Sequence, residues 1–146
     1  MAMKLNHSKT IGESQEPYFI AEINSSHNGN MEMAKNLVKA AFQAGCDCAK
    51  FQSWTPDTLY SKTFYMGNPI AKRIVQKFSL SQDQLRELAD YCRETGIDFS
   101  STPYSEPEVD WLIELNVPFI KISSMEINNY GFLRYAASTK VPIILS

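Results

Sequence analysis

The 146-residue chain has few of the residues that mark secreted or metal-binding proteins. It contains three cysteines and two histidines. Three cysteines form neither an even disulfide set nor a four-ligand metal pattern, so Cys46, Cys48 and Cys92 are expected to be small buried hydrophobic residues. A lone histidine after a strand is more often packed than metal-bound, and we expect no metal site from His7 and His27.

Long apolar runs and an excess of one charge are also missing. No run approaches the roughly 20 apolar residues that cross a bilayer, and residues 1–17 have no apolar signal-peptide core. Fourteen basic and sixteen acidic residues give a net charge of −2. This balance does not favour binding to nucleic acid or to a membrane, so any anion site must be local. We therefore expect a cytoplasmic protein.

Apolar strand-like runs alternate with amphipathic helical segments along the chain. Residues 1–17 are expected to be a polar arm or small hairpin, and 53–68 a turn-rich excursion containing Pro56 and Gly67. The predicted strands are 18–23, 48–52, 97–101, 119–122 and 142–145. The predicted helices are 30–44, the segment from Ser81 to Gly96, 106–115 and 132–138.

This alternation predicts an α/β fold with parallel strands joined by crossover helices. A doubly wound sheet and a (β/α)8 barrel both satisfy it. No G-x-G-x-x-G motif follows the first strand, and polar groups end several successive strands, which favours a TIM-type barrel. Such a barrel needs eight strands and commonly about 250 residues. Residues 18–146, with about five strands, are therefore expected to be its amino-terminal portion.

Lys50 and Lys121 each follow an apolar run, although lysine is uncommon inside strands. Two ammonium groups at the same end of a sheet indicate a phosphate or carboxylate ligand, with hydroxyl donors from other strand ends. The donors are Thr102, Ser123, Ser124 and Ser146. Two alternatives remain open: one lysine is an ion-pair partner of a glutamate, or one forms a Schiff base as in class I aldolases.

Glu22 and Glu126 also lie at or after strand ends. A carboxylate there can accept a proton from a substrate hydroxyl or from water, or orient a sugar; a purely structural role is the alternative. Gln52 and Asn68 carry amides that can read hydroxyl or amide groups of a sugar, although asparagine is also a common turn residue. Together these residues suit a polyhydroxylated substrate.

Five motifs in register resemble the sialic acid synthase family over nearly the whole chain. They are F-I-A-E-I-x-x-x-H-N-G, K-F-Q, S-S-T-P-Y-S, K-I-S-S-x-E-x-N-N and P-I-I-L-S. The resemblance implies a C–C bond-forming transferase that condenses phosphoenolpyruvate with an N-acetylated amino sugar, such as N-acetylmannosamine, to give a sialic or related nonulosonic acid and phosphate.

The resemblance also implies roles for individual residues. Gln52 and Asn68 would face the sugar, and Glu22 and Glu126 would act near the sugar aldehyde or the attacking water. A divalent metal ion, usually manganese, would polarise the aldehyde. Its ligands are expected in the later strands, outside this chain. The residues that would hold phosphoenolpyruvate are Lys50, Thr102, Lys121, Ser124 and Ser146.

Two departures from the family pattern bear on this expectation. Family members usually read E-I-G-x-N-H-N-G, whereas this chain has Asn24 in place of the glycine and Ser26 in place of the asparagine. The metal-binding histidines and the carboxyl-terminal antifreeze-like domain of the family also have no counterpart here. We therefore expect a partial synthase whose full-length form is a homodimer. Alternatives are another phosphoenolpyruvate- or Schiff-base-using barrel aldolase and a non-catalytic half-barrel that binds a ligand or a complementary chain.

Overall fold

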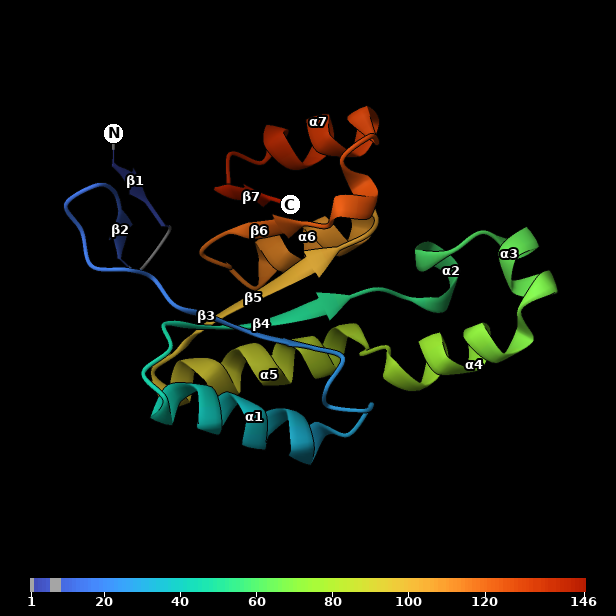
Figure 1. The fold of residues 1–146 in the computed structure, drawn as a ribbon, viewed down its shortest axis with the longest axis horizontal. Helices are drawn as coiled ribbons and strands as arrows, with labels where there is room; N and C mark the ends of the chain where they lie inside the picture. The colour runs from blue at the N-terminus through green and yellow to red at the C-terminus, as the bar shows by residue number, and fades with distance from the viewer. Residues whose placement is uncertain (1, 6–8) are drawn as a thin grey trace.

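The computed structural model describes residues 2–5 and 9–146, in which strands and helices alternate from β3 to β7 (Figure 1). The strands are β1 (Met3–Lys4), β2 (Thr10–Ile11), β3 (Ile20–Asn24), β4 (Cys48–Ser53), β5 (Asp98–Pro103), β6 (Ile120–Ile122) and β7 (Ile143–Leu145). The helices are α1 (Met31–Gln43), α2 (Pro56–Leu59), α3 (Lys62–Gly67), α4 (Pro69–Phe78), α5 (Gln82–Thr95), α6 (Glu106–Glu114), the 3-10 helix η1 (Ser124–Glu126) and α7 (Tyr130–Ser138).

The strands from β3 to β7 are parallel wherever they pair. β4 lies between β3 and β5, and β6 pairs with β7. A side-chain hydrogen bond connects the two groups of strands, because Ser100 Oγ on β5 donates to the carbonyl of Phe119, just before β6, at 2.8 Å. The predicted α/β class with a parallel sheet is confirmed.

Alternation along the central strands separates an apolar face from a polar face. Ala49 and Phe51 of β4 belong to the main core, which includes buried residues of α1 and α5, the two helices that cover one face of this sheet (Figure 1). Phe51 stacks on Phe99 of β5 with ring centroids 5.7 Å apart. Lys50 and Gln52, the intervening residues of β4, point to the other side of the sheet and line a cavity there.

Most predicted boundaries agree with the structure to within two residues, because the capping residues act as the sequence indicates. Asn30 caps α1 by accepting from the Met33 N–H at 2.9 Å. Ser81 and Gln84 form a capping box at the start of α5, and Gly96 ends this helix with a φ of 86°. A left-handed glycine is the usual residue at such an end.

The segment expected to be turn-rich, 53–68, is largely helical. It contains α2 and α3, and α4 follows in a stretch with no predicted element. Pro56 and Pro69 occupy the first positions of α2 and α4. Proline suits this position because its fixed φ is helical and because an N–H there would have no hydrogen-bond acceptor within the helix. The prolines therefore start helices here, and the turn-rich prediction was wrong for this reason.

Residues 3–4 and 10–11 form the antiparallel pair β1–β2. Leu5 is fully buried against Cys48 and Phe119, at the amino ends of the parallel strands. Cys48 and Cys92 are fully buried, as predicted, and Cys46 is half-buried. Burial raises the pKa of the Cys92 thiol to about 12, so this residue packs as a hydrophobe. His7 lies outside the described residues.

None of the helices described is both long enough and apolar enough to cross a membrane.

Candidate functional site

Polar residues from five strands or strand ends meet around a cavity of about 330 Å³ at the carboxyl end of the sheet. Seven of the nine site residues predicted from the sequence line it: Glu22, Lys50, Gln52, Thr102, Lys121, Ser124 and Ser146. Ser123, which the sequence predicted as a further hydroxyl donor, also lines the cavity, and Asn24 and Tyr104 complete the lining. The carboxyl ends of parallel strands are where α/β folds place their ligand sites, so this cavity is the candidate site.

Lys50 is the most buried charge of the cavity, with 3% of its side chain exposed. Its Nζ lies 2.9 Å from Glu22 Oε2, 2.9 Å from Thr102 Oγ1 and 3.1 Å from Asn24 Oδ1. The Phe51 carbonyl oxygen lies 3.4 Å away, so four acceptors share the three N–H bonds of the ammonium group. The ion-pair alternative left open by the sequence is therefore realised for Lys50, with Glu22 as its partner.

Lys121 is less enclosed and has a different set of partners. Its Nζ donates to the Ile122 carbonyl at 3.1 Å and to Ser146 Oγ. Burial lowers the pKa of Lys121, the charge of Lys50 lowers it further, and Glu22 opposes the effect. Two lysines close enough to depress a pKa create a local positive region, which a phosphate or carboxylate would stabilise.

Tyr104 joins the polar side chains of the cavity to the loops at its rim. Gln52 Nε2 donates to Tyr104 Oη at 3.0 Å. Burial raises the pKa of Tyr104, so the phenol stays protonated at neutral pH. The Tyr104 backbone N–H donates to the fully buried Glu108 at 2.6 Å, and Glu108 also accepts from Thr58 Oγ1 at 2.5 Å. Glu108 thus ties the loop after β4 to the loop after β5.

Two predicted site residues do not line the cavity. Glu126 is in η1 and accepts a hydrogen bond from Asn129 Nδ2 at 2.8 Å. Asn68 is exposed at the junction of α3 and α4, and its Nδ2 donates to the Phe64 carbonyl at 3.1 Å. The structure gives both side chains local capping contacts, and their predicted roles at a substrate stay predictions.

The sequence reasoning did not select Asn24 or Tyr104 as site residues. A usable signal was present, since Asn24 follows Glu22 by two positions and Tyr104 follows Thr102 by two, so each pair shares a strand face. Asn24 has a φ of 50°. Glycine and asparagine are the residues that best tolerate this left-handed region, which explains physically how one can replace the other at this position.

The residues of the candidate site do not form a metal centre by themselves. No cluster of three or more His, Cys, Asp or Glu side chains suited to a metal ion occurs in the described part of the chain. Glu22 is paired with Lys50, and His27 Nδ1 accepts a hydrogen bond from the Gly29 N–H at 3.0 Å. A manganese ion would need ligands in addition to these residues, and the expectation of manganese stays a prediction.

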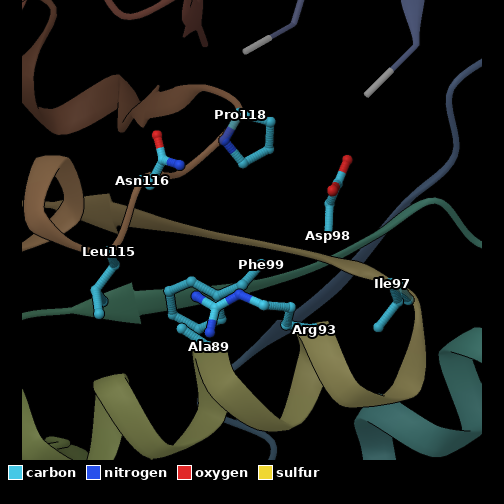
Figure 2. Close-up of a pocket in the computed structure, with 8 residues that line it drawn as sticks. All are labelled: Ala89, Arg93, Ile97, Asp98, Phe99, Leu115, Asn116 and Pro118. Carbon is cyan, nitrogen blue, oxygen red and sulfur yellow. The ribbon is translucent and has the colours of Figure 1, made fainter. Parts of the chain in front are cut away.

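Figure 2 shows a second cavity, of about 270 Å³, near the amino end of β5. Arg93, Asp98 and Asn116 contribute its polar groups. None of the predicted site residues lies there, and ligand sites of parallel α/β sheets lie at the opposite strand ends. This cavity is therefore not the candidate site.

The cavity lined by lysines, hydroxyls and a carboxylate lies where parallel α/β proteins place their ligand sites. Comparison with known families shows which kind of protein this is. Residues 37–146 match the model of the NeuB family. The chain belongs to this family.

Individual relatives agree with this assignment. The chain is 37% identical to N,N'-diacetyllegionaminic acid synthase of Legionella pneumophila, over 98% of the chain and 43% of that protein. It is 31% identical to human N-acetylneuraminate-9-phosphate synthase, over 100% of the chain and 43% of that protein. The chain thus spans less than half of the length of these relatives.

Solved structures show the same arrangement of elements. The crystal structure of the sialic acid synthetase of Leptospira borgpetersenii, in complex with citrate, matches with a TM-score of 0.90 and 25% identity, over 99% of this chain and 49% of that one. The spore coat polysaccharide biosynthesis protein spsE of Bacillus subtilis matches with a TM-score of 0.81 and 33% identity, over 99% of this chain and 39% of that one.

Proposed function

We propose that this chain is the amino-terminal part of the (β/α)8 barrel of a phosphoenolpyruvate-dependent nonulosonic acid synthase. The synthase condenses phosphoenolpyruvate with an N-acetylated amino sugar and releases phosphate. One observation carries the proposal: in a chain of the NeuB family, Glu22, Lys50, Gln52, Thr102 and Lys121 converge on one cavity. The relatives named above are synthases of legionaminic and N-acetylneuraminic acid compounds.

Lys121 and the neighbouring hydroxyls bind phosphoenolpyruvate in this proposal. Lys121 Nζ already contacts Ser146, and Ser124 lines the same cavity. Lys50 and Thr102 lie on the adjacent strands β4 and β5, and Lys50 Nζ donates a hydrogen bond to Thr102 Oγ1 at 2.9 Å. Charge-assisted hydrogen bonds from two lysines and several hydroxyls suit a ligand that carries both a carboxylate and a phosphate.

Glu22 and Gln52 contact the sugar and the attacking water. Half of the Glu22 side chain is exposed, so its carboxylate can both pair with Lys50 and accept a proton from water. Gln52 Nε2 donates a hydrogen bond to Tyr104 Oη at 3.0 Å. The amide oxygen of Gln52 is therefore left to accept from a sugar hydroxyl. Neutral amides and a carboxylate are the groups that usually recognise polyhydroxylated ligands.

The proposed reaction balances with one water molecule. The C=C electron pair of phosphoenolpyruvate forms the new C–C bond from C3 to the aldehyde carbon, and the aldehyde oxygen becomes an alkoxide. Water adds to C2; its protons are transferred to the alkoxide and to phosphate. The C2–O bond to phosphate then breaks, phosphate leaves with the electron pair, and a keto acid remains.

Four earlier expectations belong to this proposal. The manganese ion expected from the resemblance would polarise the aldehyde when bound, with ligands from outside this chain. The homodimer and the cytoplasmic location are predictions. The roles of Asn68 and Glu126 are also predictions, since both side chains lie outside the cavity lining.

Two measurements test the proposal. Titration calorimetry of the chain with phosphoenolpyruvate should give saturable binding that is roughly tenfold or more weaker in Lys121→Ala. Phosphate release from phosphoenolpyruvate, N-acetylmannosamine and manganese should occur when a separately expressed carboxyl-terminal half of a related synthase is added. Absence of phosphoenolpyruvate binding by the unaltered chain would overturn the proposal.

The lowered pKa of Lys121 favours one second candidate, a Schiff-base aldolase. A neutral amine is the nucleophile that attacks a carbonyl, and depression of the pKa increases its fraction. Borohydride treatment in the presence of pyruvate distinguishes the two mechanisms. A reduced adduct on Lys121, detected by mass spectrometry, would support the aldolase, and its absence would remove this candidate.

A further inference from the structure

Asn24 stands at the end of β3 in an unusual backbone conformation and lines the candidate site. Its φ of 50° lies in the left-handed region, which non-glycine residues seldom adopt. Strained backbone of this kind concentrates at functional sites. The side chain is half-buried and reaches Lys50, with Oδ1 at 3.1 Å from Nζ.

The contact with Lys50 determines which way the Asn24 amide points. A lysine ammonium group only donates hydrogen bonds, so the atom that faces it must be the amide oxygen. The –NH2 group of Asn24 is therefore on the side away from Lys50 Nζ. Among the residues that the structure describes, no acceptor is bonded to this –NH2, which leaves two N–H donors for a ligand of the cavity.

The position of Asn24 indicates which ligand would use these donors. Asn24 and Glu22 come from β3, whereas Lys121 and the serines come from the opposite side, at β6 and β7. The cationic groups suit an anionic ligand, and a neutral donor beside a carboxylate suits hydroxyl and carbonyl oxygens. The β3 side of the cavity thus resembles a sugar site more than an anion site.

We propose that Asn24 is a specificity-determining residue that donates from its –NH2 group to a hydroxyl or acetamido oxygen of the acceptor sugar. Lys50 orients the amide by binding its oxygen. This inference rests on the proposed function, because it assigns one more contact to the sugar of that reaction. It also gives a role to one of the two positions, 24 and 26, at which the chain departs from the family motif.

The left-handed backbone makes two informative variants possible. Asn24→Gly removes the amide and keeps the backbone conformation, because glycine adopts a positive φ without strain. Asn24→Asp keeps the side-chain shape and the acceptor for Lys50 but has no N–H donor. Asn28→Gly is a matched control, since Asn28 has a φ of 52°, is exposed and does not line the cavity.

The experiment measures sugar affinity by saturation-transfer NMR on the full chain with phosphoenolpyruvate present. The probes are N-acetylmannosamine, N-acetylglucosamine and N-acetylgalactosamine. Loss of one neutral hydrogen bond should weaken binding of the preferred sugar about three- to tenfold in Asn24→Gly and Asn24→Asp. Phosphoenolpyruvate affinity should not fall in Asn24→Gly, because the Asn24 oxygen no longer competes for the N–H donors of Lys50. Asn28→Gly should match the unaltered chain.

Each contrary outcome has a separate meaning. Unchanged sugar affinity in Asn24→Gly would overturn this inference and leave the proposed function intact. Equal losses of sugar and phosphoenolpyruvate affinity in Asn24→Gly would also overturn it, because they indicate a structural role. Failure of all three sugars to bind while phosphoenolpyruvate binds would overturn it as well. If the unaltered chain bound no phosphoenolpyruvate, the proposed function would fail, and this inference with it.

Discussion

Lys50 Nζ and Glu22 Oε2 lie 2.9 Å apart on two adjacent parallel strands, β3 and β4, and both residues line the candidate site. The two residues are direct partners in the strand register. Lys50 is almost fully buried and Glu22 is half-exposed, so the carboxylate lies between the buried ammonium group and solvent. The pair therefore partly neutralises the cationic character that the two lysines bring to the cavity.

Removal of the Glu22 charge should strengthen anion binding while it reduces turnover. Glu22→Gln retains an oxygen that can accept from Lys50 but leaves the lysine charge uncompensated. Phosphoenolpyruvate affinity, measured by calorimetry, should rise about two- to fivefold. Phosphate release in the mixture with a carboxyl-terminal half should fall at least tenfold. Glu32→Gln, on the exposed start of α1, is the control. Weaker anion binding in Glu22→Gln would contradict the prediction.

Phosphoenolpyruvate affinity should depend on pH through Lys121. Its pKa lies below the usual 10.5 because of burial and of Lys50. The charged ammonium group binds the anion, so between pH 8 and 10 the affinity should decrease as pH rises through the depressed pKa of Lys121. Above pH 8 a phosphate group is already fully ionised, since its second pKa is about 6, and calorimetry from pH 8 to 10 therefore isolates the lysine.

Substitution of Lys121 provides the control for that pH dependence. Lys121→Met should weaken phosphoenolpyruvate binding roughly tenfold or more, because a charged hydrogen bond is lost. The remaining affinity should change little between pH 8 and 10. Lys39→Met on the exposed face of α1 should behave like the unaltered chain. An equally steep pH dependence in Lys121→Met would show that another group is responsible.

Glu108 should stabilise the loops that carry the cavity rim. Its carboxylate accepts from the Thr55 N–H at 3.2 Å, from Thr58 Oγ1 and from the Tyr104 N–H, and its side chain is fully buried. In Glu108→Gln an –NH2 group replaces one of the two carboxylate oxygens. This –NH2 group then faces an N–H or O–H donor, and the hydrogen bond between them is lost. The free energy of unfolding should fall by about 1–3 kcal/mol in urea titrations.

The exposed neighbour Glu106 is the matched control for Glu108. Glu106→Gln should change the free energy of unfolding by less than about 0.5 kcal/mol. Glu108→Gln should also weaken sugar binding, because Tyr104 holds Gln52 through its hydroxyl group. A stable Glu108→Gln variant with unaltered sugar binding would refute the rim function of this residue.

Gly29 should be irreplaceable by alanine for two reasons. It has a φ of 73°, and a Cβ there would lie 2.0 Å from the backbone carbonyl oxygen of Lys77 at the end of α4. Gly45 shares the left-handed φ, at 80°, but has no atoms within 4 Å of such a Cβ. Gly29→Ala should cost about 3 kcal/mol or more and Gly45→Ala about 1 kcal/mol. If Gly29→Ala and Gly45→Ala lost the same free energy of unfolding in chemical denaturation, the contact with Lys77 would be ruled out as a cause.

His27 should make the chain less stable in mild acid. It is buried, and burial lowers its pKa below the usual 6.5, opposed by a hydrogen bond to the backbone of Asn24. Nδ1 accepts from Gly29, so a proton added there would face an N–H group. The folded state thus binds this proton less readily than the unfolded state, and stability is full above pH 6.5 and declines as pH falls through the depressed pKa.

Urea titrations between pH 7.5 and 5 test the His27 prediction. The midpoint of the unaltered chain should fall across this range. His27→Gln, which has no titrating group, should start at a lower midpoint and vary less with pH. A decline of the same steepness in both proteins would assign the pH dependence to other residues.

Local patterns in the sequence were sufficient for the order and type of most elements. Such patterns depend only on residues near each other in the chain. They include the spacing of apolar residues, the helix caps at Asn30 and Ser81 and the glycine at position 96, and they act as predicted. The segment after β4 was the exception. Its prolines were interpreted as turn signals, although proline suits the first position of a helix equally well.

The sequence by itself also determined which side chains could share a site, because parallel strands bring their carboxyl ends to one edge. It identified Lys50, Lys121, Thr102 and Ser146 in this way. Only the tertiary structure decided how these groups pair. The Lys50–Glu22 ion pair, the Asn24–Lys50 hydrogen bond and the hydrogen bond from Thr58 to Glu108 depend on strand register and loop packing. Those contacts join residues that are about 25 to 50 positions apart, and no local pattern encodes such distances.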